Sequence, residues 1–161
     1  MSKRNPKIIA SQIVLSYSSP DINTLEGEAK PNAYEGKDYP LYQLSYRDFE
    51  FLTYSLYKQE IGNKKLLYDD IALMSGVRDK AQDCILYRNK TKSGIIQCKH
   101  SEKNKPLATR GCVEEILKFL LYSLQENTLI PDINNFPYYF ASSSGFDTKA
   151  DQYLRSFTQR I

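Results

Sequence analysis

Apolar residues recur at two spacings along the chain, and the changes between them predict the order of the elements. Around 46–59 and 111–124 they return every three or four residues, which is typical of a helix that buries one face. Around 82–88, 93–99 and 136–142 they form short runs bounded by turn residues, which is typical of strands. One more helical pattern closes the chain. The order helix–strand–strand–helix–strand–helix predicts an α/β fold with a small mixed sheet flanked by helices.

Two of the helical segments carry cues for their ends and faces. Ser45 is a predicted N-cap because Asp48 follows three residues later, and Gly62 is predicted to end that helix. Segment 66–74 fits either a short strand or a helical turn. The expected inward face of the first helix holds Phe49, Leu52, Thr53 and Leu56. The apolar stripe of the 111–124 helix holds Val113, Ile116, Leu117, Leu120, Leu121 and Leu124.

The first forty-five residues differ in character from the rest. Residues 8–17 fit one strand, whereas 18–40 are rich in proline and glycine and poor in apolar residues, which favours irregular structure. We therefore expect 1–45 to be an accessory segment and 46–161 to be the functional domain.

Composition narrows the class of protein. With 161 residues, a net charge of +3 and no apolar run close to the roughly 20 residues that span a bilayer, we expect a cytoplasmic protein with no membrane segment. The odd number of cysteines, three, favours reduced thiols over disulfides or a zinc site. A single histidine and the lack of glycine-rich nucleotide motifs argue against a serine hydrolase or a P-loop ATPase.

Basic residues gather between positions 88 and 110, where Glu102 is the one acid. Basic loops bind the phosphate backbone of nucleic acids without reading sequence, although such a run can also be a solvated surface. The predicted DNA contacts are Lys90, Lys92, His100, Lys103, Lys105 and Arg110.

The predicted hairpin places three chemically useful residues near one another. Because side chains alternate along a strand, Gln97 and Lys99 share one face, and Cys98 lies on the other. Asp83 opens the neighbouring strand. An acid and an amide oxygen beside a lysine are suited to holding a hard divalent cation next to a phosphodiester.

This pattern, Asp83 followed by Gln97-x-Lys99, resembles the PD-(D/E)xK nuclease superfamily, and the Gln-Cys-Lys form resembles its Mrr-like restriction endonucleases and anti-phage effector domains. Phe49-Glu50 also resembles the family's helical Phe-Glu. Gly76 and Asp79-Lys80 lie where the family has a glycine-containing loop. Residues 138–150 resemble the family's next strand, polar turn and helix. The resemblance covers the chain from about 46 onwards and implies a restriction-endonuclease-like core.

The resemblance implies a metal-dependent DNA endonuclease that uses Mg²⁺ or Mn²⁺. Asp83, Gln97 and Glu50 would hold the metal, with Asp70 and Asp79 as weaker alternatives to Glu50. Lys99 would complete the catalytic set, either as a charged donor or as a base, and His100 would lie at the periphery.

The same resemblance implies double-stranded DNA as partner and the setting of a bacterial anti-phage or restriction system. We expect either a homo-oligomer or a domain fused to a C-terminal sensor or ATPase module. Two alternatives stay open: a catalytically inactive nuclease-like domain that binds DNA or mediates assembly, and an enzyme like the Holliday-junction resolvases.

Overall fold

The structure is a computed structural model that describes residues 39–74 and 80–158 of the chain. The predicted positions of Gly76 and Asp79 and most of the 1–45 segment lie outside these residues. Along the described part, the elements follow the predicted order, with one additional strand. They are α1 (Tyr46–Gly62), β1 (Asp70–Leu73), β2 (Cys84–Arg88), β3 (Thr91–Lys99), α2 (Thr109–Gln125), β4 (Tyr138–Ser142) and α3 (Thr148–Thr158), with short 3-10 turns at Leu41–Gln43 and Ile133–Asn135.

The four strands form one mixed sheet in the order β1-β2-β3-β4, which confirms the predicted α/β architecture. Strands β1, β2 and β3 pair antiparallel, whereas β4 runs parallel to β3 because α2 carries the chain back along the sheet. The segment 66–74, for which the sequence left two structures open, supplies the edge strand β1.

The β2–β3 hairpin is tighter than the predicted turn 89–93. Arg88 pairs with Thr91, so only Asn89 and Lys90 form the turn, and both have positive φ values of 51° and 63°. Such a turn matches the right-handed twist of the two strands. A bulge at Leu86/Tyr87 shifts the register. Beyond the bulge, a Cβ at Gly94 would lie 3.1 Å from Cγ of Pro137, so this close approach of two chain segments favours glycine.

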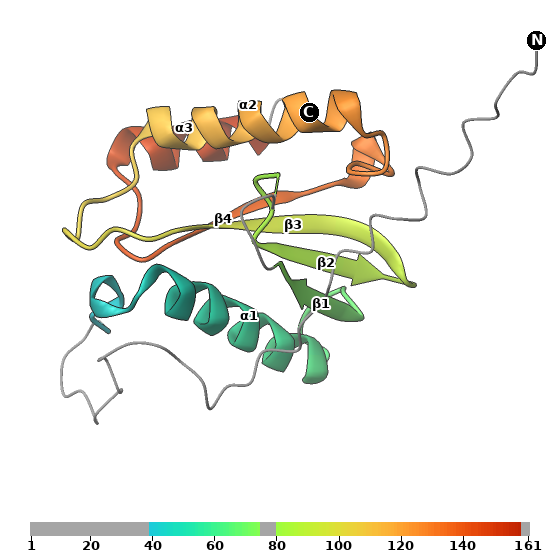
Figure 1. Cartoon of the computed structure of the whole chain (residues 1–161), viewed down its shortest axis with the longest axis horizontal. Helices are drawn as coiled ribbons and strands as arrows, with labels where there is room; N and C mark the ends of the chain where they lie inside the picture. Colours follow the sequence, from blue (N-terminus) through green and yellow to red (C-terminus); the bar gives the residue numbers. More distant parts are fainter. Residues whose placement is uncertain (1–38, 75–79, 159–161) are drawn as a thin grey trace, which may run out of the picture.

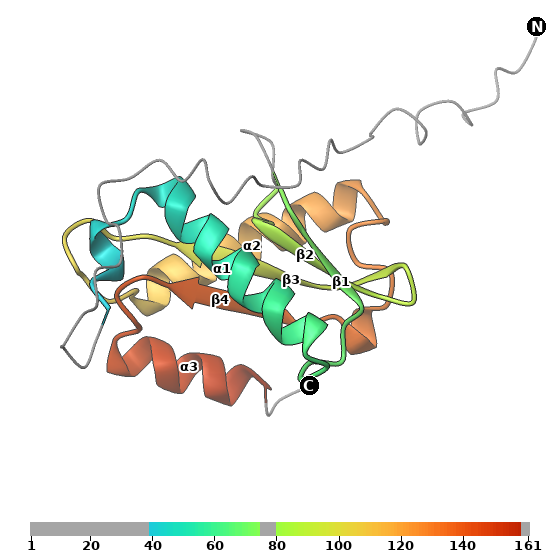
Figure 2. The ribbon, with the colours of Figure 1, turned by 90° about the horizontal axis from the view of Figure 1, so that it is seen from below.

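Helices cover both faces of the sheet (Figure 1). One face packs on α1 through a cluster that includes Phe49, Ile71, Leu86, Ile96 and Cys98. The other packs beneath α2 through Ile85, Ile95, Phe119 and Leu129. Helix α3 lies on the same side as α2 (Figure 1), and the view from below shows it beside β4 (Figure 2).

Helix α1 begins where the sequence predicts it to begin. The Ser45 hydroxyl accepts a bond from the Asp48 backbone N–H and donates to the Asp48 carboxylate at 2.8 Å, and the helix ends at Gly62. Its predicted inward face is wrong at Leu56, which is 53% exposed. Tyr54 and Ile61 are buried instead, because the helix is rotated so that Glu50 also faces the sheet.

Helix α2 also forms as predicted, but its apolar stripe does not face the sheet. The residues it buries are Cys112 and Phe119, which lie on the opposite side of the helix from the leucines of the stripe. No helix among the described residues is long and apolar enough to cross a membrane.

Candidate functional site

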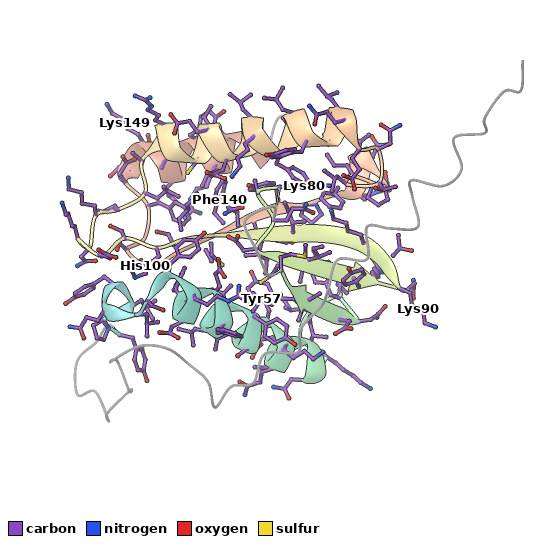
Figure 3. The ribbon with its side chains drawn as sticks, viewed as in Figure 1. Tyr57, Lys80, Lys90, His100, Phe140 and Lys149 are labelled. Atoms are coloured by element: carbon purple, nitrogen blue, oxygen red, sulfur yellow. The ribbon has the colours of Figure 1, made fainter. Side chains whose placement is uncertain are left out.

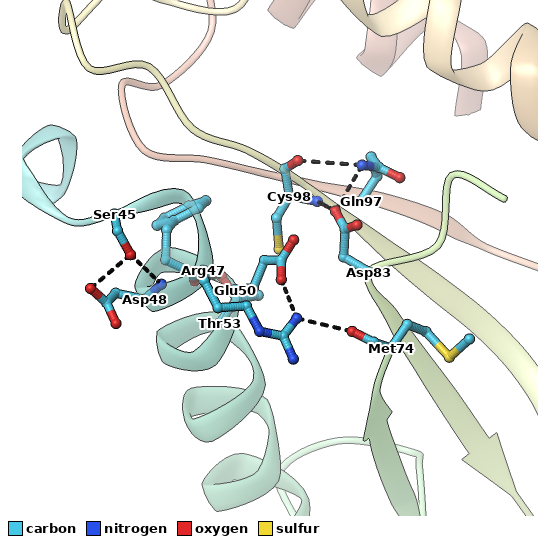
Figure 4. A network of polar contacts seen from close by, with 10 residues as sticks. Ser45, Arg47, Asp48, Glu50, Thr53, Met74, Asp83, Gln97 and Cys98 are labelled. Atoms are coloured by element: carbon cyan, nitrogen blue, oxygen red, sulfur yellow. Dashed lines mark hydrogen bonds and ion pairs between the residues drawn. The ribbon is translucent and has the colours of Figure 1, made fainter. Parts of the chain in front are cut away.

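Asp83 lies at the point where the chain enters β2, and its carboxylate is bonded to β3. Its own backbone N–H donates to the carbonyl of Ile96 at 3.1 Å, which continues the antiparallel ladder by one residue. Its Oδ2 atom accepts from the Cys98 backbone N–H at 2.5 Å and from Nε2 of Gln97 at 2.7 Å (Figure 4). Since Asp83 and Gln97 are each only 2% exposed, the two side chains form a buried polar pair at one end of the sheet.

The other half of the Gln97 amide has no partner. Its Oε1 atom is fully buried and accepts no hydrogen bond in the described part of the chain. Turning the amide over would place Oε1 against the Asp83 carboxylate and replace an attraction with a repulsion, so the bond from Nε2 fixes the orientation. A buried carbonyl oxygen without a donor is rare, and water or a cation is its usual partner.

Glu50 approaches this end of the sheet from α1, on the face opposite to the side chains of Gln97 and Lys99. It is 5% exposed and forms an ion pair with Arg47, whose guanidinium also donates to the Met74 carbonyl at 3.0 Å (Figure 4). The pKa of the Cys84 thiol responds to both Asp83 and Glu50. Its pKa is raised first by a hydrogen bond with Cys98 and by burial, and further by the charges of Asp83 and Glu50. Glu50 and Asp83 are therefore both near Cys84.

Lys99, at the end of β3, does not reach towards Asp83. Its Nζ lies 2.8 Å from Oε1 of Glu115 on α2, and the two side chains are 27% and 16% exposed. The second oxygen of Glu115 lies 3.7 Å from Nζ of Lys118. The sequence reasoning did not identify Glu115. Glu115 lies on the inner side of α2 with Cys112 because the apolar stripe faces outward, which the sequence pattern did not indicate.

The oxygen donors at this end of the sheet suit a hard cation, but they are not assembled around one point. Among the described residues, no group of three or more histidine, cysteine, aspartate or glutamate side chains is placed to hold a metal. The unpartnered Oε1 of Gln97 fits a cation ligand by its chemistry. For Gln97 and Asp83 to bind the same ion, however, the amide must first turn over and release its bond to Asp83.

Asp70 does not belong to this site. It opens β1 opposite Tyr87, near the turn of the hairpin, and its carboxylate lies 2.6 Å from Nζ of Lys58. Of the three acids considered beside Asp83, Glu50 lies at this end of the sheet and Asp70 does not, while Asp79 lies outside the described residues.

The predicted DNA contacts divide between the two ends of the hairpin. Lys103 and Lys105 are exposed in the loop that follows Lys99, and Arg110 is exposed in the first turn of α2, bonded to Glu114 at 2.7 Å. His100 is half-buried, with its ring 6.1 Å from that of Phe49. Lys90 lies in the turn at the opposite end of the sheet from His100 (Figure 3).

Lys92 does not fit the prediction that it contacts DNA. Its amine donates to the side-chain oxygen of Gln82 and lies 5.9 Å and 5.6 Å from the rings of Phe119 and Phe136. Burial lowers the pKa of Lys92 to about 8, and the nearby Lys80 lowers it further, while Glu126 opposes the shift. The side chain points beneath α2 because the bulge at Leu86/Tyr87 skips one residue of β3 and pairs Lys92 with Tyr87, which packs on the same cluster as Ile95.

Comparison of the chain with protein-family models, with curated proteins and with solved structures found no match. What the arrangement can do is therefore argued from its residues. It presents a buried carboxylate–amide pair, a second buried acid and an accessible lysine at one end of a sheet, beside an exposed basic loop. These groups suit a cation and a phosphate by their chemistry, but in this arrangement they do not converge on one point.

Proposed function

We propose that this chain is a metal-dependent DNA endonuclease domain of the PD-(D/E)xK type, serving a bacterial anti-phage or restriction system. One observation carries the proposal. Asp83 and Gln97, from neighbouring strands, meet at 2.7 Å in the interior, while Oε1 of Gln97 is left buried and unpartnered. A mixed sheet between helices, with the acid at the start of β2 and the lysine at the end of β3, supports a restriction-endonuclease-like core.

Asp83 and Gln97 would hold Mg²⁺ or Mn²⁺, and Glu50 would supply the second negative charge. When bound, such an ion acidifies water and polarises a phosphate oxygen. Because Gln97 is neutral, the charge of Glu50 matters more here than it would beside a second carboxylate. In the present arrangement Arg47 neutralises Glu50, so the Arg47 pair competes with any cation for this acid.

We assign Lys99 the role of a charged donor rather than a base. The ammonium of Lys99 has three N–H donors, one of them directed at Glu115, so the others would donate to negative charge that develops on a phosphate. Glu115 would act on the reaction only through Lys99, as a positioning residue that anchors the amine over the end of β3. The loop with Lys103 and Lys105 would hold the DNA backbone beside it.

The test is cleavage of plasmid DNA by the full chain with Mg²⁺ or Mn²⁺. Asp83→Ala and Lys99→Ala are each expected to lower the cleavage rate at least roughly 100-fold, in line with the loss of a group that stabilises transition-state charge. Lys58→Ala is the matched control, because Lys58 is also a lysine paired with an acid, but it lies at the outer edge of the sheet. Cleavage that survives in both site variants would exclude this assignment.

A second candidate is the catalytically inactive alternative, a nuclease-like domain that binds DNA or mediates assembly. The observation in its favour is that Gln97 presents an N–H rather than an oxygen to Asp83, a closed pair that needs no cation. The same experiment separates the two. DNA binding with no metal-dependent cleavage at any protein concentration favours the inactive domain.

A further inference from the structure

The side of α2 that faces away from the sheet is rich in leucine and open to solvent. Leu117, Leu120, Leu121 and Leu124 are 53%, 42%, 62% and 80% exposed. They follow the spacing i, i+3, i+4, i+7, so they form one stripe about two turns long. Figure 1 shows α2 as an outer layer of the molecule, with the sheet beneath it. Contiguous apolar surface of this kind is rare on a monomer and usually marks a binding site.

We propose that the stripe is the contact surface for the same helix of a second copy of this chain, packed antiparallel about a two-fold axis. The sequence of the stripe is the first reason. The six positions of the predicted stripe, of which Val113 and Ile116 are half-buried, are symmetric about the point between Lys118 and Phe119, so reversing the helix superimposes the stripe on itself. Leu117 then faces Leu120 of the partner subunit, and Val113 faces Leu124 of the partner subunit.

The second reason is the size and charge of the residues that face each other when the two helices pair antiparallel in this way. The remaining apolar pair, Ile116 with Leu121 of the partner subunit, flanks the central leucines, so each contact joins two branched apolar side chains. Glu114 falls opposite Ser123 of the partner subunit, and no like charges oppose each other there. A two-fold interface needs a surface that is complementary to itself, and this stripe meets that condition.

The inference is independent of the proposed nuclease activity, because it rests on the outer face of α2 alone. The candidate active site lies on the other side of this helix, where Glu115 holds Lys99. A symmetric dimer would nevertheless carry two such sites, which is what cutting both strands of DNA requires.

The experiment is the molar mass of the full chain in solution, measured by sedimentation or light scattering from low to high micromolar concentration. The expected result is a species of twice 18.6 kDa that dissociates on dilution. Leu117→Lys and Leu120→Glu are each expected to give monomers. The double variant Leu117→Lys/Leu120→Glu is expected to restore the dimer, because the introduced lysine and glutamate face each other twice in this register.

Leu67→Lys is the matched control, since Leu67 is 78% exposed but lies outside α2, and its dimer should persist. Circular dichroism establishes that each monomeric variant remains folded. A wild-type chain that stays monomeric throughout overturns the proposal, whether or not the leucine variants change its thermal stability. A dimer that survives both single variants also overturns it, because the contact must then lie on another face. Failure of the double variant to restore the dimer overturns the antiparallel register.

Discussion

Helices α1 and α2 are both 17 residues long and cover opposite faces of one sheet, yet they distribute polar and apolar residues in opposite ways. Helix α1 buries Asp48, Glu50 and Thr53. Helix α2 exposes four leucines on its outer side and buries only Cys112 and Phe119 fully. Neither arrangement follows from burial of apolar area alone.

Under the two proposals above, each helix serves something besides the core. Buried polar groups cost free energy unless they are paired, and Arg47 and Ser45 pair with Glu50 and Asp48 here. We assign Glu50 to the proposed active site. Exposed leucines contribute little to the folding of one chain, and we assign those of α2 to the proposed contact with a second copy.

The largest expected effect on stability comes from comparing the buried side of α2 with its exposed side. Phe119→Ala removes a ring that is 2% exposed and packs on Phe136 and Tyr138, and it should lower the free energy of unfolding by about 3–5 kcal/mol. Leu124→Ala should change it by less than about 0.5 kcal/mol. Denaturant unfolding at low protein concentration measures both. Equal losses in the two variants would mean that the outer face is covered within one chain.

Gln97→Glu tests the polar side of the comparison. It places a second carboxylate beside buried Asp83 and removes a 2.7 Å bond, so we expect a loss of roughly 3 kcal/mol in the unfolding free energy at neutral pH. Repulsion raises the pKa of the shared acid pair in the folded state. The loss of stability caused by this repulsion is therefore absent below the ordinary pKa of glutamate. It grows as the pH rises towards the raised pKa of the pair.

Mg²⁺ should reverse this loss if the pair is a cation site. A metal that binds only the folded state stabilises it, so the melting temperature of Gln97→Glu should rise with Mg²⁺ more than that of the wild type. Gln59→Glu is the matched control, because it changes an exposed glutamine of α1. An equal response in all three proteins would argue against a metal at Gln97.

Much of the fold was predictable because it depends on local patterns. The N-cap at Ser45, the β2–β3 hairpin and both long helices follow from spacing and capping residues that act within a few positions. The side of β3 on which Gln97 and Lys99 lie also follows, since alternation is a property of any strand. The juxtaposition of Asp83 and Gln97 depends further on the two-residue turn and the bulge, which set the register and which the sequence did not predict.

The contacts between distant elements were not predictable in the same way. Periodicity identifies an apolar stripe but does not say what it faces, so the exposure of Leu56 and of the α2 leucines could not be foreseen. The pairing of Lys99 with Glu115 depends on where α2 crosses the sheet. The burial of Lys92 depends likewise on how far α2 extends over the start of β3.

Lys92 is half-buried beneath α2, and its titration is expected to have a smaller effect on the unfolding free energy. Its pKa of about 8 lies below that of an unfolded lysine, so the unfolded state binds more protons above this pH. Its contribution to stability should thus increase between about pH 8 and 10.5, by roughly 1–3 kcal/mol. The measurement is the difference in unfolding free energy between wild type and Lys92→Met across that range, and a constant difference would contradict the burial of the amine.

The smallest expected effect on stability, with a clear effect on DNA binding, comes from comparing the segments where the two helices begin. Helix α1 begins with buried acids, whereas the chain approaches α2 through the exposed Lys103 and Lys105. Replacing these lysines with alanine should change the unfolding free energy by less than about 0.5 kcal/mol each. It should weaken DNA binding and lower the slope of log K against log salt by about 1 per lost phosphate contact.

Lys90→Ala is the matched control, because Lys90 is equally exposed but lies in the hairpin turn, at the far end of β3 from the site. Nine residues of strand separate the two ends, about 30 Å at the usual rise per residue. If DNA lies across the end with Lys99, the salt dependence of Lys90→Ala should equal that of the wild type. If Lys90→Ala weakens DNA binding as much as Lys103→Ala does, the DNA lies along the sheet instead, away from the acids of α1.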